Sequence, residues 1–142
     1  MNEYLDIDLA WGGFYARTFA DQSEVSIIRL LDFNLDVYHA ALFDERVEEI
    51  PRAAAVETLS PFIRHVPLDA RGLLNIEAMV LIGRKPLTRS CLEGYMYYLE
   101  EFEVPEDERE ELMNSLIAFS KDDPLKLRLY LSNGELQIEE RD

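Results

Sequence analysis

A basic segment in the middle of the chain carries the side chains best suited to bind an anion. Arg84, Lys85 and Arg89 are three closely spaced cations, and Thr88 and Ser90 add hydroxyl groups. Because this segment leads into a predicted helix, backbone N–H groups and the positive end of the helix dipole would face the same ligand. We expect the cluster either to hold a phosphate, a carboxylate or an acidic segment of a partner, or to offset an acidic neighbour within the fold.

An acidic segment follows directly. Residues 93–111 hold nine acidic residues and one basic residue. Exposed carboxylates there could dock a basic protein or mimic nucleic-acid phosphates, although such runs also serve as a solvated face and as counter-charges to a helix dipole. The candidate docking residues are Glu100, Glu101, Glu103, Glu106, Asp107, Glu108, Glu110 and Glu111.

Two histidines and one cysteine are the remaining candidates for chemistry. His39 lies near Asp32, and His65 also has a carboxylate nearby, so either could be an oriented general base; a satisfied core histidine is the simpler expectation. Cys91, at a predicted helix start, could have a lowered thiol pKa. It also borders an apolar stripe, and we expect packing to be its role.

The signature motifs of several enzyme classes are missing. The chain has no GxGxxG, GxxxxGK[ST], GxSxG or paired CxxC, and its histidines fit neither HxH nor HExxH. We assign no catalytic residue, no metal site and no cofactor. The sequence therefore favours a binding protein over an enzyme and leaves catalytic activity open.

Length and composition predict a single domain over residues 1–142, with 48% hydrophobic residues to build one core. A net charge of −15 disfavours nucleic acid and anionic membrane surfaces as partners and favours a basic protein. A single cysteine, a start without a signal peptide and the lack of a long apolar run favour a reducing, cytoplasmic location.

Apolar periodicity predicts strands through the first part of the chain. Residues 5–11 alternate, Gly12 and Gly13 indicate a turn or bulge, and residues 14–19 suit a returning strand. Two further strands are favoured over about 25–31 and 36–43, with a tight connection near Asn34. A helix over 23–31, capped by Ser23, is the alternative.

The middle of the chain is less regular. Residues 53–59 are good helix formers, Ser60 and Pro61 suit the start of another short turn, and residues 66–72 suggest a loop. Residues 76–82 form a short apolar run that fits a buried strand or a short helix equally well.

The second half predicts a helical hairpin. One helix covers about 89–102, capped by Thr88 or by Ser90 in a capping box, and Gly94 within it suggests close packing of a neighbour. A second helix covers about 105–120, and the short link between them implies an αα-hairpin. The inner stripes are Leu92, Tyr95, Met96 and Leu99 on the first helix and Leu112, Met113, Leu116, Ile117 and Ser120 on the second.

The end of the chain predicts a β-hairpin over 125–140. Asn133-Gly134 is a preferred two-residue turn, and it pairs Leu129 with Ile138 and Arg128 with Glu139. The apolar residues then share one face and the opposite charges share the other.

Together these elements predict an α+β fold, mainly antiparallel sheet packed against the helical hairpin. Three functions are compatible with this fold. The first is an acidic domain that binds a basic protein, as an inhibitor or toxin-neutralising immunity protein does. The second is an anion-binding domain or enzyme with a pocket beside the 89–102 helix, and the third is a self-associating structural subunit, with the oligomeric state left open.

Overall fold

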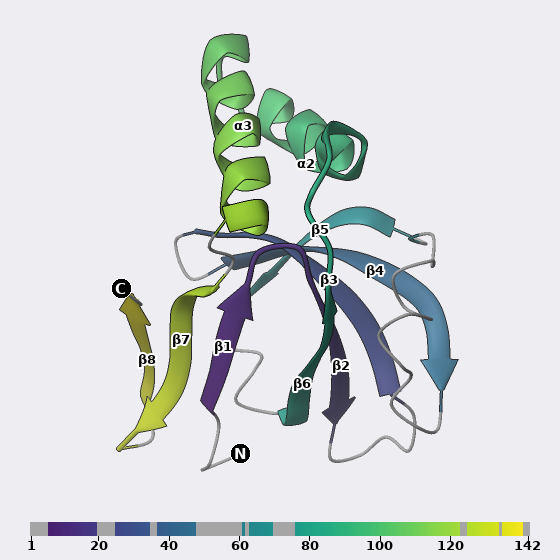
Figure 1. Cartoon of the computed structure of the whole chain (residues 1–142), viewed down its shortest axis with the longest axis vertical. Helices are drawn as coiled ribbons and strands as arrows, with labels where there is room; N and C mark the ends of the chain where they lie inside the picture. Colours follow the sequence, from purple (N-terminus) through teal and green to yellow (C-terminus); the bar gives the residue numbers. More distant parts are fainter. Residues whose placement is uncertain are drawn as a thin grey trace.

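The fold combines two antiparallel sheets with two helices and belongs to the α+β class. The computed structural model describes residues 6–19, 25–34, 37–47, 61, 63–69, 76–122, 125–133 and 135–140. Figure 1 shows both helices at one end of the molecule, above the sheets. The predicted class is therefore confirmed, and residues 53–59, noted as good helix formers, lie outside the described residues.

The larger sheet has the strand order β5-β4-β3-β2-β6, and the smaller sheet has the order β1-β7-β8. All neighbouring strands run antiparallel. The strands are β1 (Asp6–Ala10), β2 (Gly13–Phe19), β3 (Val25–Asn34), β4 (Val37–Val47), β5 (Ile63–Asp69), β6 (Ile76–Arg84), β7 (Leu125–Ser132) and β8 (Glu135–Glu140).

The first two strands belong to different sheets, because β1 pairs with β7 while β2 lies between β3 and β6. The expectation that the second strand returns beside the first is therefore wrong, although both strands exist. Gly12 turns the chain between the sheets at a φ of 82°. The buried Tyr15 hydroxyl fixes this corner: it donates to the Asp8 carbonyl at 2.6 Å and accepts the Ala10 N–H at 2.7 Å.

Strands β3 and β4 confirm the two strands predicted for this region and overturn the alternative helix over 23–31 for its described part, residues 25–31. Asn34 and Val37 are register partners, so the connection is as tight as expected. The ambiguous run 76–82 is a strand, β6.

The predicted loop over 66–72 is wrong for residues 66–69, which belong to β5. β5 is an edge strand of the larger sheet, so Pro67 can lie in it without breaking a ladder on both sides. Residues 70–72 lie outside the described part of the chain.

The helical hairpin consists of α2 (Arg89–Glu101) and α3 (Glu106–Asp122), which confirms the prediction. Thr88 caps α2, so the alternative cap at Ser90 is not used. The predicted stripes face the core: Leu92, Tyr95, Met96, Met113, Leu116 and Ser120 are buried, and Leu99, Leu112 and Ile117 are partly buried.

Gly94 lets α2 approach β5 closely, as expected. A Cβ atom at Gly94 would lie 3.0 Å from the Arg64 Cβ and 3.2 Å from the His65 Cβ. The approach brings the aromatic side chains of α2 onto the histidines of the larger sheet.

The larger sheet buries side chains on both faces. One face joins the helices and the smaller sheet in the main core, to which Tyr15 and Ile28 belong. The other face carries a second cluster, because successive side chains of a strand point to opposite sides. This second cluster contains Phe14, Ala16, Ile27, Ala41 and Phe43.

The C-terminal β-hairpin has the predicted register, with Leu129 opposite Ile138 and Arg128 opposite Glu139. Asn133 has the positive φ of 54° that its turn requires. Arg128 also forms two hydrogen bonds with Asp6 of β1, each 2.9 Å long, which ties the hairpin to the rest of the smaller sheet.

Candidate functional site

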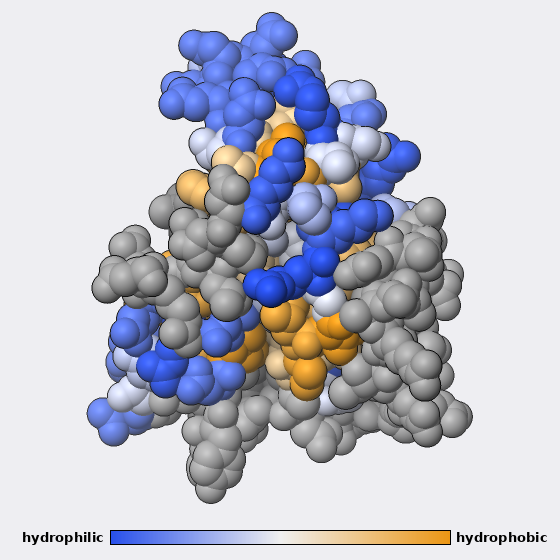
Figure 2. Space-filling model, viewed as in Figure 1, coloured by the Kyte–Doolittle hydropathy of each residue, from blue (hydrophilic) through white to orange (hydrophobic). Residues whose placement is uncertain are grey.

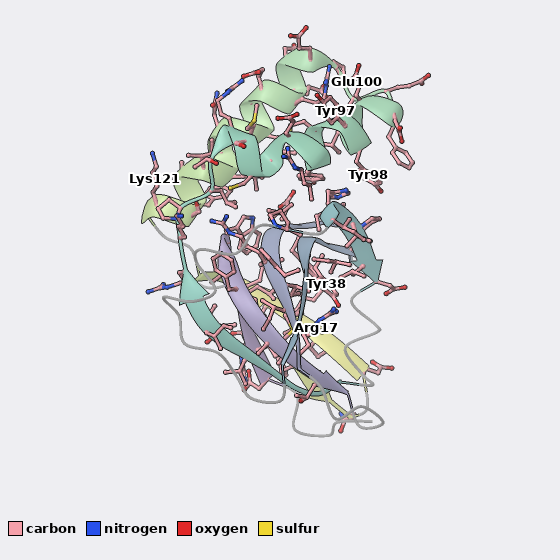
Figure 3. All side chains as sticks on the ribbon, turned by 90° about the vertical axis from the view of Figure 1, so that its right-hand side faces the viewer. Arg17, Tyr38, Tyr97, Tyr98, Glu100 and Lys121 are labelled. Carbon is pink, nitrogen blue, oxygen red and sulfur yellow. The ribbon has the colours of Figure 1, made fainter. Side chains whose placement is uncertain are left out.

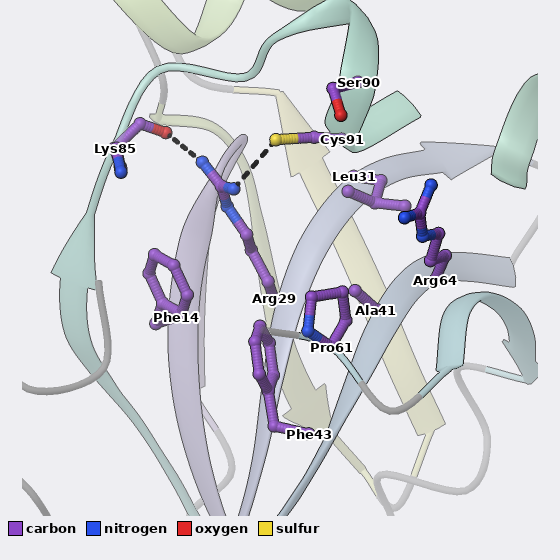
Figure 4. Close-up of a pocket in the computed structure, with 10 residues that line it drawn as sticks. All are labelled: Phe14, Arg29, Leu31, Ala41, Phe43, Pro61, Arg64, Lys85, Ser90 and Cys91. Atoms are coloured by element: carbon purple, nitrogen blue, oxygen red, sulfur yellow. Dashed lines mark hydrogen bonds between the residues drawn. The ribbon is translucent and has the colours of Figure 1, made fainter. Parts of the chain in front are cut away.

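A cavity of about 350 Å³ lies beside the start of α2 (Figure 4). The predicted basic segment contributes Lys85 and Ser90 to its lining. Thr88 caps the helix from the connecting loop, with its Oγ1 3.2 Å from the Cys91 nitrogen. A concave surface therefore exists where the anion-binding hypothesis requires one.

The other two cations of the basic segment do not line this cavity. Arg89 forms a double hydrogen bond with Glu110 of α3, at 2.7 and 3.1 Å. Arg84 is exposed at the end of β6, where it is the register partner of Gly13. For Arg89, the expectation that the basic segment offsets an acidic neighbour within the fold is therefore confirmed.

The cavity opens onto the second face of the larger sheet. Phe14, Arg29 and Ala41 are cross-strand neighbours on β2, β3 and β4, and Phe43 lies further along β4. The rings of Phe14 and Phe43 are 5.7 Å apart at an angle of 45°. Arg64 of β5 completes the set of cations at the rim. The site therefore combines positive charge with an aromatic wall.

Arg29 is the buried cation of this site, with only 7% of its surface exposed. Its Nε donates to the Gly12 carbonyl at 3.2 Å, and its Nη2 donates to the carbonyls of Lys85 at 2.8 Å and Pro86 at 3.3 Å. Its guanidinium carbon also lies 4.8 Å from the centre of the Phe14 ring. No carboxylate pairs with Arg29 in the described part of the chain, where its charge meets backbone carbonyls, an aromatic ring and a thiol.

That thiol belongs to Cys91 in the first turn of α2. Its Sγ accepts hydrogen bonds from Arg29 Nη1 and from Thr88 Oγ1, each at 3.1 Å. Burial opposes ionisation, but the hydrogen bonds of Thr88 and the charge of Arg29 outweigh it and lower the pKa of the Cys91 thiol. The cation beside the thiol is thus Arg29, rather than its sequence neighbour Arg89.

The two histidines form a direct pair between the larger sheet and α2. His39 Nδ1 lies 2.8 Å from His65 Nε2, and both rings stack on Tyr95, with centroids 4.4 and 5.0 Å away. Tyr98 packs against both rings as well. Burial lowers the pKa of each imidazole to about 4, and for His39 the proximity of His65 adds to the effect. Both rings are therefore neutral at pH 7.

Asp32 belongs to a neighbouring buried network, and its bonds do not orient a histidine. Its carboxylate accepts the Tyr95 hydroxyl at 2.7 Å, the Trp11 indole N–H at 3.3 Å and the Phe33 N–H at 2.8 Å. Burial raises the pKa of Asp32 against these three bonds. The suggested carboxylate–histidine base at His39 and Asp32 is therefore not formed.

The acidic segment lies at the free end of the helical hairpin, which Figure 2 shows as a hydrophilic cap at the top of the molecule. We call its eight candidate docking residues the acidic tip. Seven of them are exposed and Glu110 is partly exposed. Two aromatic side chains are exposed beside them, Tyr97 of α2 at 60% and Phe102, the C-cap residue of α2, at 66%. Figure 3 shows Tyr97 and Glu100 together on this end of the hairpin.

Sequence reasoning missed two basic residues of the cavity, Arg29 and Arg64. A signal for Arg29 was present, because it is the one charged residue in the apolar run 27–31. A lone arginine there must find partners inside the fold. Arg64 gave no such signal, because its place at the cavity depends on the pairing of β5 with β4.

The chain matches no protein-family model, no curated protein and no solved structure. Among the described residues, no group of three or more His, Cys, Asp and Glu side chains could hold a metal ion. No described helix is both long and apolar enough to cross a membrane.

Proposed function

We propose that this protein is a protein-interaction domain that binds a basic partner through the acidic tip, in a reducing, cytoplasmic setting. The observation that carries the proposal is that exposed carboxylates surround exposed aromatic side chains at the free end of the hairpin. Aromatic side chains supply the apolar anchor of many interfaces, and surrounding charges set partner choice and association rate.

Most carboxylates of the acidic tip form no ion pair with other described residues of the chain. Glu110 pairs with Arg89, and Glu100 lies 3.5 Å from Arg109. The other six carboxylates form no ion pair in the described part of the chain. Glu106, Asp107 and Glu108 do complement the dipole of α3, so the carboxylates free for a partner are Glu101, Glu103 and Glu111.

Phe102 is the expected anchor of the contact. It is two-thirds exposed, and its ring packs against the Tyr98 ring at a tilt of 47°, with a centroid distance of 4.7 Å. A ring held by one neighbour and open to solvent on its other side loses little conformational entropy on binding. A partner pocket that takes Phe102, with Lys or Arg at its rim, fits this surface.

Matched charge reversals test the proposal. The first step identifies the proteins that bind the immobilised chain at low salt and elute at high salt. The second step measures their affinity for the wild type, Glu101→Lys and Glu135→Lys. Both variants change net charge equally, but Glu135 lies on β8, away from the acidic tip. We expect Glu101→Lys to weaken binding about fivefold and Glu135→Lys to change it little.

Phe102→Ala examines the anchor separately from the charge. We expect it to weaken binding about tenfold, because central aromatic residues carry much of an interface energy. Equal affinities for wild type, Glu101→Lys and Phe102→Ala would place the interface elsewhere and contradict the proposal.

A further inference from the structure

We propose that the cavity beside α2 is a second, separate binding site, which takes a small carboxylate with an aromatic body. The acidic tip and this cavity share no residue. The inference is independent of the docking function, and either one can fail without the other.

In the described part of the chain, no carboxylate neutralises the two arginines of the cavity. Arg29 bonds carbonyls and a thiol and lies over the Phe14 ring, and Arg64 has no hydrogen-bond or ion-pair partner among the described residues. Lys85 also lines the cavity. Charges of the distant acidic tip are screened over about 8 Å at physiological ionic strength, so the local excess of cations decides which ligand enters.

Among the described residues, one N–H of Arg29 has no partner and is available for that ligand. A guanidinium has five N–H groups, and the bonds to Gly12, Lys85, Pro86 and Cys91 use four of them. The remaining N–H is on Nη1, the nitrogen that also bonds the Cys91 sulfur. The Ser90 hydroxyl is exposed at the same cavity. A carboxylate oxygen can therefore meet a charged donor and a hydroxyl together.

The rest of the wall selects an apolar body. Phe14 and Phe43 offer two rings, and Leu31, Ala41 and Pro61 extend the apolar surface (Figure 4). The two phenylalanines are buried, with 2% of Phe14 and 7% of Phe43 exposed, so the lining offers a bare phosphate few polar partners, whereas an aromatic acid can pack against it. A volume of about 350 Å³ lies within the range of small-molecule sites.

Cys91 provides a built-in reporter, since it is the single cysteine of the chain. A carboxylate bound at Arg29 competes for the cation that stabilises the thiolate. Occupation of the cavity should therefore slow alkylation of Cys91 by iodoacetamide, by removing thiolate and by blocking access.

Benzoate is the probe, with benzyl alcohol as its uncharged analogue and inorganic phosphate as the bare anion. We expect saturable benzoate binding that raises Tm and slows Cys91 alkylation about threefold, with weaker effects of the other two. No effect of benzoate on either readout would overturn the proposal. Equal protection by phosphate would overturn the assigned ligand class.

Arg64→Ala and Arg84→Ala form a matched pair, because each removes one exposed arginine and only Arg64 lines the cavity. Neither replaces the buried Arg29, so the fold is kept. We expect Arg64→Ala to weaken benzoate binding about tenfold and Arg84→Ala to leave it unchanged. Equal losses in the two variants would mean that benzoate responds to net charge alone, which contradicts a built site.

Discussion

At the scale of single residues, the histidine pair shows how burial sets protonation. His39 and His65 share one hydrogen bond, so two protonated rings would face each other at 2.8 Å between nitrogens. Tyr95 stacks on both rings and the tilted Tyr98 ring packs against them. The pair is stable only while it remains largely uncharged.

The lowered pKa values predict a loss of stability in mild acid. Each imidazole has a pKa of about 4 when folded and an ordinary value near 6.5 when unfolded. Between these values the unfolded chain binds more protons, so stability is fully present above pH 6.5 and falls as the pH drops towards 4. The slope is at most about 1.4 kcal/mol per pH unit for each histidine.

Urea unfolding of wild type and His65→Gln between pH 7.5 and 4.5 measures this slope. The variant should show a shallower loss of stability over that interval. Asp32 acts in the opposite direction because burial raises its pKa, and it is present in both proteins, so the difference isolates the histidine. Identical slopes would show that the pair does not control acid stability.

Gly12 is the residue on which the corner beside the cavity depends. It combines a φ of 82° with a backbone so close to Lys85 that an added Cβ would lie 2.4 Å from the Lys85 carbonyl oxygen. Its own carbonyl accepts Arg29 Nε. Gly12→Ala should therefore destabilise the fold by about 2–4 kcal/mol, through strain and through displacement of the loop that Arg29 binds.

Chemical denaturation of Gly12→Ala beside Gly94→Ala provides the comparison. Gly94 has ordinary helical geometry and less severe contacts, the closest at 3.0 Å, so its loss should be smaller. A larger loss at Gly94 than at Gly12 would contradict this account of the corner.

Sequence reasoning located part of the candidate site at this scale. Lys85 and Ser90 were chosen for their positions just before and at the start of a predicted helix, which is a local property. Arg29 and Arg64 line the same cavity because of strand pairing. Arg89 does not line it and instead bonds Glu110 of the neighbouring helix α3. Contacts between distant segments decided the composition of the site.

At the scale of elements, the turn between α2 and α3 carries a strained residue. Glu103 has a φ of 63°, and the Val104 N–H bonds the Leu99 carbonyl at 3.1 Å, which closes the end of α2. Glycine is the residue that normally occupies this position. Glu103→Gly should raise the free energy of unfolding by about 0.5–1 kcal/mol.

Glu103→Ala is the control, because it removes the same charge and keeps the side-chain strain. Thermal unfolding should rank Glu103→Gly above both Glu103→Ala and the wild type. If the glycine and alanine variants were equally stable, charge would be responsible and backbone strain would not.

Pairings between neighbours in the sequence were predictable, and pairings with distant strands were not. The β7–β8 hairpin and the α2–α3 hairpin each pair neighbours in the sequence, so register and periodicity were enough to define them. The alternation of residues 5–11 indicated a strand but not its partner, and β1 in fact pairs with the far end of the chain. Likewise, the segment around Pro67 was predicted as a loop, because the sequence does not show that its strand lies at the edge of a sheet, where a proline is tolerated.

At the scale of the whole molecule, charge is divided between two sites. The acidic tip lies at the free end of the hairpin, and the cationic cavity lies at the other end of α2, against the larger sheet. Arg89 and Glu110 join the basic and acidic segments at one point, and Glu100 lies near Arg109, but the other six carboxylates of the acidic tip form no ion pair in the described part of the chain. The net charge of −15 is thus unevenly distributed, and the acidic tip favours approach of a basic partner to the hairpin.

The salt dependence of the association rate with the captured partner tests the docking account most directly. For the wild type, the rate constant should fall about tenfold between 20 and 200 mM salt, and Glu101→Lys should show a lower rate at low salt with a flatter dependence. An association rate that is independent of salt and identical in the wild type and Glu101→Lys would contradict docking through the acidic tip.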